Sequence, residues 1–322
     1  MTRTAFHAAP AAAGVFFCAA LLTLNGCASL GTPPMTAQLL AAPPVALPVR
    51  GQAAAPFFAQ RDYQCGPAAL AMALAAGGLA VTADQLTPQV YLPAREGSLQ
   101  PEMLATARRH GRLAVVLPPR LDALLAEVAA GHPVIVLQNL ALPASPVWHY
   151  AVVIGYDLAR GAITLHSGVT PHMTMELAVF ERTWARSGHW AMAAVPPSQL
   201  PTTVGTDELV QAAAALERVQ PAAALPAYEA IVARHADAYG AWIGLGNTRH
   251  AAQDLPGAEA AFARATELRP SAGDAWNNLA LVRLARGNVA AARAAAQRAV
   301  DLAGPRLARY RETLAAVERA AQ

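Results

Sequence analysis

The sequence predicts an α+β domain followed by an all-α domain. Two observations predict this order. Between residues 51 and 198, segments with the Ala and Leu content of helices come first, and segments rich in Val, Ile, Thr and aromatic residues follow. From residue 206 to residue 322 the chain becomes an Ala-rich helical sequence with an internal repeat. The 322 residues suffice for a domain of enzyme size and a smaller module.

The first residues have the pattern of a bacterial export signal. Arg3 supplies a positive charge, and residues 11–24 form an apolar run with the length of a signal-peptide core rather than of a membrane span. The run ends in Leu24-Asn25-Gly26-Cys27, which resembles a lipobox, where cleavage precedes a cysteine that carries a lipid. We therefore expect a lipoprotein signal peptide over residues 1–26 and lipid attachment at Cys27. The alternative is an ordinary secretory signal with an incidental cysteine.

Residues 27–50 are rich in Pro and Ala and carry very little charge, which predicts an extended tether between the lipid and the first domain. Ala28 stands where an Asp would resemble an inner-membrane retention signal. The expected location is therefore the cell envelope, at the periplasmic face of the outer membrane, with the membrane contacted through the lipid anchor.

Within residues 51–198, composition and apolar spacing predict three helices, over residues 66–76, 101–110 and 121–130. Strand-like content follows at residues 133–138, 150–155, 162–166 and 190–195. Residues 157–161 fit a hairpin turn between the second and third of these strands.

The Ala-rich region aligns with itself at an offset of 34 residues, most clearly through Trp242 and Trp276. The same offset pairs other small or apolar residues: Leu245 with Leu279, Gly246 with Ala280, Ala258 with Ala292, and Ala265 with Ala299. This period and the order Trp, Leu-Gly, Ala, Phe, Pro resemble the tetratricopeptide repeat.

A degenerate earlier repeat is expected from about Glu208, because one more step of 34 places Tyr228 under Phe262. The resemblance implies an all-α tetratricopeptide-repeat solenoid over residues 206–322, with a groove for a protein partner. A plain helical bundle is the alternative. The net charge of +3 is modest and evenly spread, so a nucleic-acid partner is not expected.

Cys65 is expected to be the only free thiol of the exported protein, because Cys18 lies in the leader and Cys27 in the lipobox. A single thiol in an oxidising compartment cannot form an internal disulfide, so its presence favours nucleophilic chemistry. Gly66 and Pro67 begin a helix directly after it, and the positive end of the helix dipole favours the thiolate. The alternative is a small buried core residue.

His149 is the candidate general base and acid. It stands at the head of an apolar run, residues 150–157, that has the composition of a buried central strand. A histidine at the tip of such a strand is well placed to face a helix N-terminus, take the thiol proton and return it to the leaving amine. Gln60 lies just before Cys65, where its amide could donate to an oxyanion together with the Cys65 backbone N–H. A satisfied core or surface histidine is the alternative for His149.

These residues resemble a known family. Gln60, the run Cys65-Gly66-Pro67-Ala68-Ala69-Leu70 and the run His149-Tyr150-Ala151-Val152-Val153-Ile154-Gly155-Tyr156-Asp157 are similar to the bacteriocin-processing cysteine peptidases, which act on double-glycine leaders and are papain-like. The resemblance covers about residues 57–195. It implies a papain-like α+β fold, hydrolysis of peptide bonds in a peptide or protein substrate, no cofactor, Cys65 as nucleophile, His149 as base and Gln60 as oxyanion residue.

Two departures from the family pattern concern the catalytic residues. Family members commonly place the Gln six residues before the Cys, whereas Gln60 is five before, so Gln64 is a weaker claimant. The third catalytic residue is usually an Asp, and Ser167 occupies its expected place. A Ser can accept a hydrogen bond from an imidazole but cannot supply charge, and a turn-capping role is equally open to it. Asp157 and Asn139 are alternatives if the geometry permits.

A metal site is not expected, because His166, His172 and His189 lack ligand spacing and a second free cysteine. The sequence thus favours a lipid-anchored periplasmic cysteine peptidase whose repeats recruit a substrate or partner. Two other functions remain open. One is a catalytically weak or inactive adaptor that acts through its repeats, and the other is a Cys-dependent acyltransferase, in which an amine resolves the acyl-enzyme.

Overall fold

The structure is a computed structural model that describes residues 31–322. Residues 33–322 form one compact unit, which is described below. The expected signal peptide over residues 1–26 and the expected lipid-attachment site Cys27 lie outside the described residues. Within the described part of the chain, every helix is too short or too polar to cross a bilayer.

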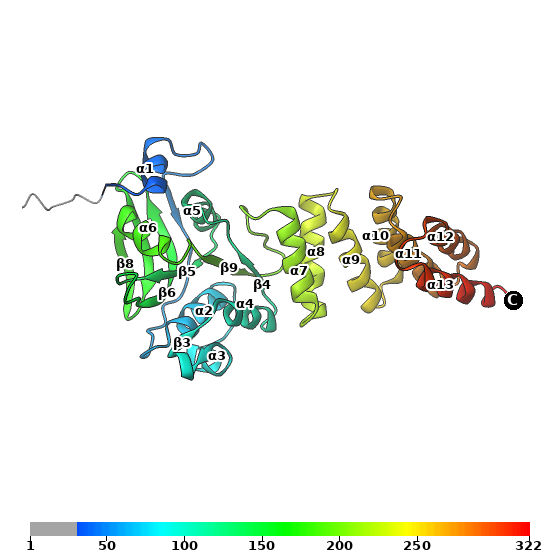
Figure 1. The fold of residues 1–322 in the computed structure, drawn as a ribbon, viewed down its shortest axis with the longest axis horizontal. Coiled ribbons are helices and arrows are strands. Elements are labelled where there is room, and N and C mark those ends of the chain that lie inside the picture. Colours follow the sequence, from blue (N-terminus) through cyan, green and yellow to red (C-terminus); the bar gives the residue numbers. More distant parts are fainter. Residues whose placement is uncertain (1–30) are drawn as a thin grey trace, which may run out of the picture. The chain divides into compact units, whose positions relative to one another are not determined.

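A seven-stranded antiparallel sheet organises the first domain (Figure 1). The strands follow the order β4-β9-β5-β6-β7-β8, and β1 pairs with β6. Their bounds are β1 Arg50–Gln52, β4 Leu113–Val116, β5 Val134–Asn139, β6 Trp148–Asp157, β7 Ala162–Ser167, β8 Thr170–Glu176 and β9 Ala191–Val195. A separate two-stranded hairpin consists of β2 Tyr91–Leu92 and β3 Gly97–Ser98, joined by the short 3-10 helix η1 Pro93–Arg95.

Helices cover both faces of the large sheet, which explains why its central strands are apolar on both sides. Alternate residues of β5 point to opposite faces, so Val134 and Val136 join one core cluster while Ile135 and Leu137 join the other. The Ile135 face packs against α2, α3 and α4, and the Val134 face against α5 and α6. These helices span α2 Cys65–Ala76, α3 Ala83–Val90, α4 Gln100–Arg109, α5 Leu121–Ala129 and α6 Leu177–Ala185.

The three predicted helices are confirmed as α2, α4 and α5, within one residue at each end, and the four predicted strands as β5, β6, β7 and β9. The predicted turn between β6 and β7 is also confirmed. The sequence did not predict α3, α6, β4, β8 or the β2–β3 hairpin. β8 is a mostly exposed edge strand with few apolar residues, and α6 contains Val, Phe, Thr and Trp, which are strand-like in composition.

The prediction of an extended tether over residues 27–50 is wrong for residues 34–41. Residues Pro34–Ala41 form a helix, α1, and β1 begins at Arg50. The carboxylate of Glu181 on α6 accepts hydrogen bonds from the backbone N–H groups of Met35 and Thr36 and from the Thr36 hydroxyl. Composition could not reveal this helix, because the acid that satisfies its first turn lies 145 residues away.

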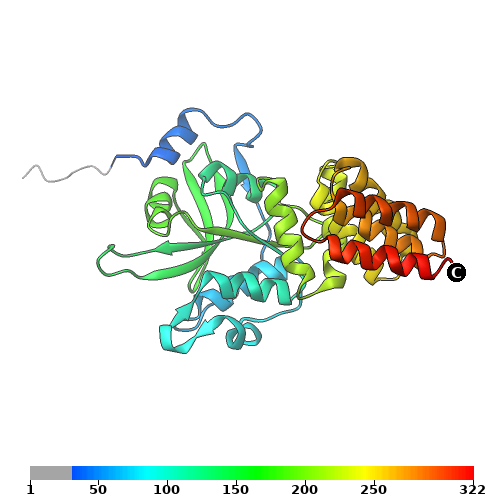
Figure 2. The ribbon, with the colours of Figure 1, turned by 45° about the vertical axis from the view of Figure 1, so that its right-hand side comes forward.

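Seven helices form the repeat region, and Figure 2 shows them stacked as successive antiparallel pairs. They are α7 Thr206–Glu217, α8 Pro221–Arg234, α9 Tyr239–Ala251, α10 Leu255–Leu268, α11 Gly273–Ala285, α12 Val289–Leu302 and α13 Leu307–Arg319. Equivalent contacts recur at the 34-residue offset. The indole N–H groups of Trp242 and Trp276 each donate to the carbonyl six residues earlier, and Asp254 and Asn288 cap α10 and α12.

The expected earlier repeat is present as the pair α7 and α8, and it shares its core with the first domain. Leu209 and Leu216 of α7 belong to the same cluster as Leu113 of β4 and Val195 of β9. Removing the repeats would therefore expose apolar surface of the first domain to water.

A buried carboxylate fixes the segment between the two domains. Oε1 of Glu127 on α5 accepts hydrogen bonds from the backbone N–H and the hydroxyl of both Thr202 and Thr203, at 2.7 to 3.0 Å. Its other oxygen lies 2.8 Å from Nδ1 of His132. From the repeat side, Arg234 donates to the carbonyls of Leu200 and Pro201. The connection is thus ordered by side chains from both domains.

Candidate active site

Cys65 is the first residue of α2 and is partly buried. A tight turn leads into the helix, in which the backbone N–H of Gln64 donates to the carbonyl of Arg61 at 3.0 Å. Tyr63 in this turn has a φ of 59°, in the left-handed region that is uncommon for a residue with a side chain. The helix predicted to start directly after Cys65 is present and begins one residue earlier, at Cys65 itself.

Gly66 allows the β2–β3 hairpin to lie directly against the first turn of α2. A Cβ atom at Gly66 would collide with the side chain of Ser98 on β3, so a larger residue would push the hairpin away. This hairpin forms one wall of a cleft next to the thiol, and Arg95 and Glu96 at its tip line that cleft. No local sequence pattern predicted the hairpin, because its strands contain only two residues each.

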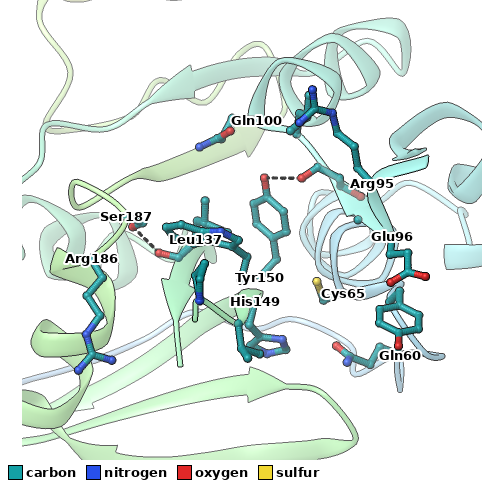
Figure 3. A pocket seen from close by; sticks show the side chains of 17 residues that line it. Gln60, Cys65, Arg95, Glu96, Gln100, Leu137, His149, Tyr150, Arg186 and Ser187 are labelled. Atoms are coloured by element: carbon teal, nitrogen blue, oxygen red, sulfur yellow. Dashed lines mark hydrogen bonds between the residues drawn. The ribbon is translucent and has the colours of Figure 1, made fainter. Parts of the chain in front are cut away.

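His149 is the second residue of β6, and its side chain is buried. Its Nε2 atom lies 2.9 Å from Oγ of Ser167 at the end of β7, which is hydrogen-bond distance. This contact occupies one edge of the ring and leaves Nδ1 on the other. Figure 3 shows the imidazole of His149, the thiol of Cys65 and the amide of Gln60 grouped at the same end of the cleft. The structure thus brings together the four residues named from the sequence.

Burial dominates the electrostatics of this pair. It raises the pKa of the Cys65 thiol, and hydrogen bonds from the backbone N–H groups of Tyr150, Gly66 and Cys65 itself offset only part of that rise. Burial also lowers the pKa of His149. Both shifts disfavour charge, so burial favours a neutral thiol and a neutral imidazole over a thiolate and an imidazolium.

Gln60, rather than Gln64, is placed to stabilise an oxyanion. The backbone N–H of Gln60 donates to the carbonyl of Gly168 at 3.2 Å, which ties this segment to the turn that follows Ser167. The side chain of Gln60 lines the cleft. The side-chain oxygen of Gln64 instead accepts a hydrogen bond from Thr87 of α3.

Neither Asp157 nor Asn139 can replace Ser167 as the partner of His149. Asp157 lies at the opposite end of β6, where its carboxylate binds Arg50. The side-chain oxygen of Asn139 accepts the backbone N–H groups of Ala141 and Val147, so it organises the loop between β5 and β6. Sequence proximity suggested both residues, but a ten-residue strand separates Asp157 from the histidine end of β6.

The cleft has a volume of about 870 Å³ and is mixed in character. Apolar and aromatic side chains come from the β5–β6 region, and charged groups come from the β2–β3 hairpin and from the residue after α6: Leu137, Pro146, Val147, Trp148 and Tyr150, with Arg95, Glu96 and Arg186. Such a volume and lining suit a peptide segment. Sequence reasoning missed Arg186, which follows an unpredicted helix, and Trp148, although Trp148 immediately precedes His149.

Tyr150 connects the thiol to the hairpin wall. Its hydroxyl donates to the carbonyl of Ser98 at 3.3 Å, while burial and the neighbouring Cys65 and Glu102 raise its pKa. The phenol therefore stays protonated across the physiological range. Its role is to hold the hairpin across the first turn of α2.

Of the three histidines considered for a metal site, His166 has other partners at both ring nitrogens. His166 is buried, with Nε2 3.1 Å from the carbonyl of Ala55, and its Nδ1 accepts the backbone N–H of His172 at 3.2 Å. Both ring nitrogens are thus engaged within the protein. Across residues 31–322, no group of three or more His, Cys, Asp or Glu side chains is arranged to hold a metal ion.

Comparison with protein families identifies two parts of the chain. Residues 52–192 match the Peptidase_C39 like family. The chain contains a C39-like peptidase domain. Residues 209–271 and 251–306 match the tetratricopeptide repeat, so the helical region of this C39-like protein consists of such repeats rather than of a plain bundle. The predicted fold class, a papain-like α+β domain followed by an all-α repeat solenoid, is confirmed at this level.

Several solved structures are similar to parts of the chain. A double glycine motif protease from an AMS/PCAT transporter, in complex with a leader peptide, is 21% identical over 45% of this chain and 94% of its own, with a TM-score of 0.37. A C39-like peptidase from Bacillus anthracis is 19% identical over 46% of this chain and 96% of its own, with a TM-score of 0.37. MamA is 19% identical over 36% of this chain and 67% of its own, with a TM-score of 0.34. No curated protein matches the chain.

Proposed function

We propose that this protein is a lipid-anchored cysteine peptidase of the bacterial envelope, which hydrolyses peptide bonds in a peptide or protein substrate. The observation that carries the proposal is the 2.9 Å contact between His149 and Ser167, in a cleft that also contains Cys65 at a helix N-terminus. The C39-like domain supports a peptidase, and the repeats support a protein partner.

The contact with Ser167 assigns a role to each edge of the His149 ring. When Nε2–H donates to Ser167 Oγ, Nδ1 carries the free electron pair and accepts the proton of the Cys65 thiol. The sulfur then attacks the carbonyl carbon of the substrate, and the amide of Gln60 and the backbone N–H of Cys65 donate to the resulting oxyanion. His149 returns the proton to the leaving amine, and water, deprotonated by the same residue, hydrolyses the thioester.

The neutral resting pair defines how the thiol is activated. Because burial raises the pKa of Cys65 and lowers the pKa of His149, the thiolate forms during attack, when a substrate carbonyl is in place, rather than beforehand. The expected pH profile of hydrolysis rises through the lowered pKa of His149, since the imidazole must be neutral to act as base. It should then stay level until alkaline pH, without the fall that follows loss of an essential imidazolium.

The first test is the alkylation of Cys65 by iodoacetamide, followed from acidic to alkaline pH in the whole mature chain and in His149→Ala. If His149 acts as base, alkylation near neutral pH should exceed that of a thiol with a raised pKa, and His149→Ala should abolish this excess. Reaction only at alkaline pH, identical in the two proteins, would rule out a functional Cys–His pair.

A second candidate function is a catalytically inactive adaptor, and the uncharged Ser167 is the observation that favours it. Without a carboxylate, nothing at His149 Nε2 supplies charge to stabilise an imidazolium. The two functions differ in the phenotype of Cys65→Ser in the source bacterium. If the protein is a peptidase, bacteria with Cys65→Ser should behave like bacteria that lack the protein. If it is an adaptor, they should behave like the unmodified strain.

Recruitment through the repeats can be tested without deleting them, which avoids exposing the shared core. A hollow of about 540 Å³ between α7 and α9 is lined by Asp207, Asp237, Tyr239 and Arg269. If a substrate or partner binds there, Asp237→Arg should reduce turnover of the native substrate while alkylation of Cys65 stays unchanged. Equal turnover by the unmodified protein and by Asp237→Arg would exclude this hollow as the recruiting surface.

The lipid anchor is tested separately, by the mass of the N-terminal peptide of protein purified from membranes. A lipid on Cys27 and its loss in Cys27→Ser would support anchoring. A peptide that begins elsewhere and carries no lipid would contradict it.

A further inference from the structure

The loop between β5 and β6 exposes several large apolar side chains. Over residues 140–148, Leu140 is 48% exposed, Leu142 71%, Val147 54% and Trp148 51%. We call residues 140–148, which include the first residue of β6, the β5–β6 loop. There is no Asp, Glu, Lys or Arg between His132 and Asp157 in the sequence, so the loop carries no formal charge. A charge-free cluster of exposed Leu, Val and Trp is typical of a surface that another phase or molecule covers.

The exposure belongs to an ordered loop. The side-chain oxygen of Asn139 accepts the backbone N–H groups of Ala141 and Val147, both at 3.0 Å. From the end of α6, Arg186 donates to the carbonyls of Asn139 and Ala141 at 3.0 and 2.8 Å. These hydrogen bonds fix the backbone at the base of the loop. The exposure of its apolar side chains is therefore a feature of an ordered loop.

The cleft accounts for only part of this surface. Val147 and Trp148 line the cleft, whereas Leu140 and Leu142 do not. A substrate in the cleft would thus leave Leu140 and Leu142 uncovered. An occupant that covers these two side chains would therefore lie outside the active site.

The same helix that braces the loop also holds the start of the first domain. Glu181 of α6 binds the first turn of α1, and Arg186 at the end of α6 binds the loop. Five residues of helix correspond to about 8 Å along the axis. Figure 1 shows α1 next to α6 at the edge of the sheet. The chain therefore enters the domain at Pro34 close to the loop.

The length of chain before Pro34 limits what can lie near the loop. Only six residues lie between Cys27 and Pro34, so the two positions are seven residue steps apart. At about 3.6 Å per residue, these steps span at most about 25 Å. If Cys27 carries a lipid, Pro34 at the start of α1 lies within about 25 Å of the bilayer surface. Because α1 is docked on α6, the same limit applies to the part of the domain around α6. An undocked tether that ended at Arg50 would have reached about three times as far.

We propose that the β5–β6 loop contacts the phospholipid bilayer through Leu140, Leu142 and Trp148, beside the mouth of the catalytic cleft. This inference rests on the lipid anchor of the proposed function. Trp at the interface and Leu toward the acyl chains match the preferences of these side chains at a membrane surface. The absence of charge avoids the cost of bringing an ionised group to the hydrocarbon. The cleft would then take substrate segments at the membrane surface.

The test is quenching of Trp fluorescence by brominated lipids. The lipidated whole chain is reconstituted into vesicles of phosphatidylethanolamine and phosphatidylglycerol, with and without brominated acyl chains. Trp148 is one of five Trp residues, and Trp276 in the repeats provides the matched control. Brominated lipid should lower the emission of the unmodified protein and of Trp276→Phe, and the loss should disappear in Trp148→Phe. Leu140→Ser with Leu142→Ser should reduce it.

Two results would overturn the inference: no quenching in the unmodified protein, or the same quenching in Trp148→Phe as in Trp276→Phe. The first result would leave a protein partner or a second copy as the occupant of the loop. The readout does not depend on catalysis, so an inactive peptidase can still show quenching, and an active one can lack it. The lipid on Cys27, measured by mass, separates failure of the anchor from failure of the loop contact.

Discussion

Two histidines in the first domain have different partners. His132 lies 2.8 Å from the buried carboxylate of Glu127, whereas His149 in the cleft lies 2.9 Å from the hydroxyl of Ser167. The carboxylate–imidazole pair, which in many hydrolases supports the base, occurs here at the segment that joins the repeats. His149, the proposed base, has only a neutral partner. The domain thus combines a charged, strongly hydrogen-bonded site that stabilises the fold with an uncharged site suited to a neutral Cys–His pair.

The Glu127 site and the His149 site also differ in how burial and hydrogen bonds combine to shift their pKa values. Burial alone would raise the pKa of Glu127, but hydrogen bonds from His132 and Thr203 reverse this and lower it. In the cleft, burial lowers the pKa of His149 without such compensation. The lowered pKa favours the charged form of Glu127, which has several hydrogen-bond donors. The lowered pKa of His149 favours its neutral form, because no charged partner offsets the burial.

The largest effect should come from breaking the stabilising site. Glu127→Ala removes the acceptor of five hydrogen-bonding groups and should lower the free energy of unfolding by about 3–5 kcal/mol, because its partners stay buried without a replacement. Denaturant unfolding measures this. Asp122→Ala on the same helix removes an exposed ion pair with Arg120 and should cost less than about 1 kcal/mol. Equal losses in both variants would contradict the assignment.

A smaller effect, on activation rather than on stability, is expected from Ser167→Ala. Without the hydroxyl, the tautomer and orientation of His149 are no longer fixed, and base-assisted alkylation of Cys65 should fall by about 10- to 100-fold. The free energy of unfolding should change by about 1 kcal/mol at most. Ser187→Ala is the matched control, since its hydroxyl donates to the carbonyl of Leu137 in the same cleft. If Ser167 only caps the turn, both variants will react alike.

Ser167→Asp would make the two sites alike. A carboxylate at this position should raise the pKa of His149 and lower that of Cys65, by about one unit each. One unit corresponds to about a tenfold gain in thiolate at neutral pH, or about 1.4 kcal/mol. Iodoacetamide alkylation should then shift toward acidic pH. An unchanged profile would show that this side chain does not govern the charge of the pair.

The smallest effect is the acid sensitivity that Glu127 contributes. A carboxyl whose folded-state pKa is lowered stabilises the fold above its unfolded pKa, and this contribution is lost as pH falls through the folded value. The unmodified protein should therefore lose stability at acidic pH more steeply than Glu127→Gln. Thermal unfolding against pH measures the slopes, and parallel curves would exclude this carboxyl as their cause.

The sequence by itself determined the order of the two domains, most of the central elements and the main catalytic candidates. Hydrophobic period, composition and a 34-residue offset are local signals, and each strand or helix that carried them was predicted within two residues. Cys65 and His149 were recognisable because both lie at the ends of such elements. The signal peptide, Cys27 and the boundaries of the domains stay predictions.

Only the tertiary structure decided which polar groups meet. It excluded Asp157 and Asn139, because strand length and loop hydrogen bonds take their side chains elsewhere, and it paired His149 with Ser167 across β6 and β7. It also turned residues 34–41 of the predicted tether into a helix whose first turn is bound by Glu181, 145 residues away from Thr36. Contacts of this kind join residues distant in sequence, and no local pattern encodes a partner that folding brings from another element.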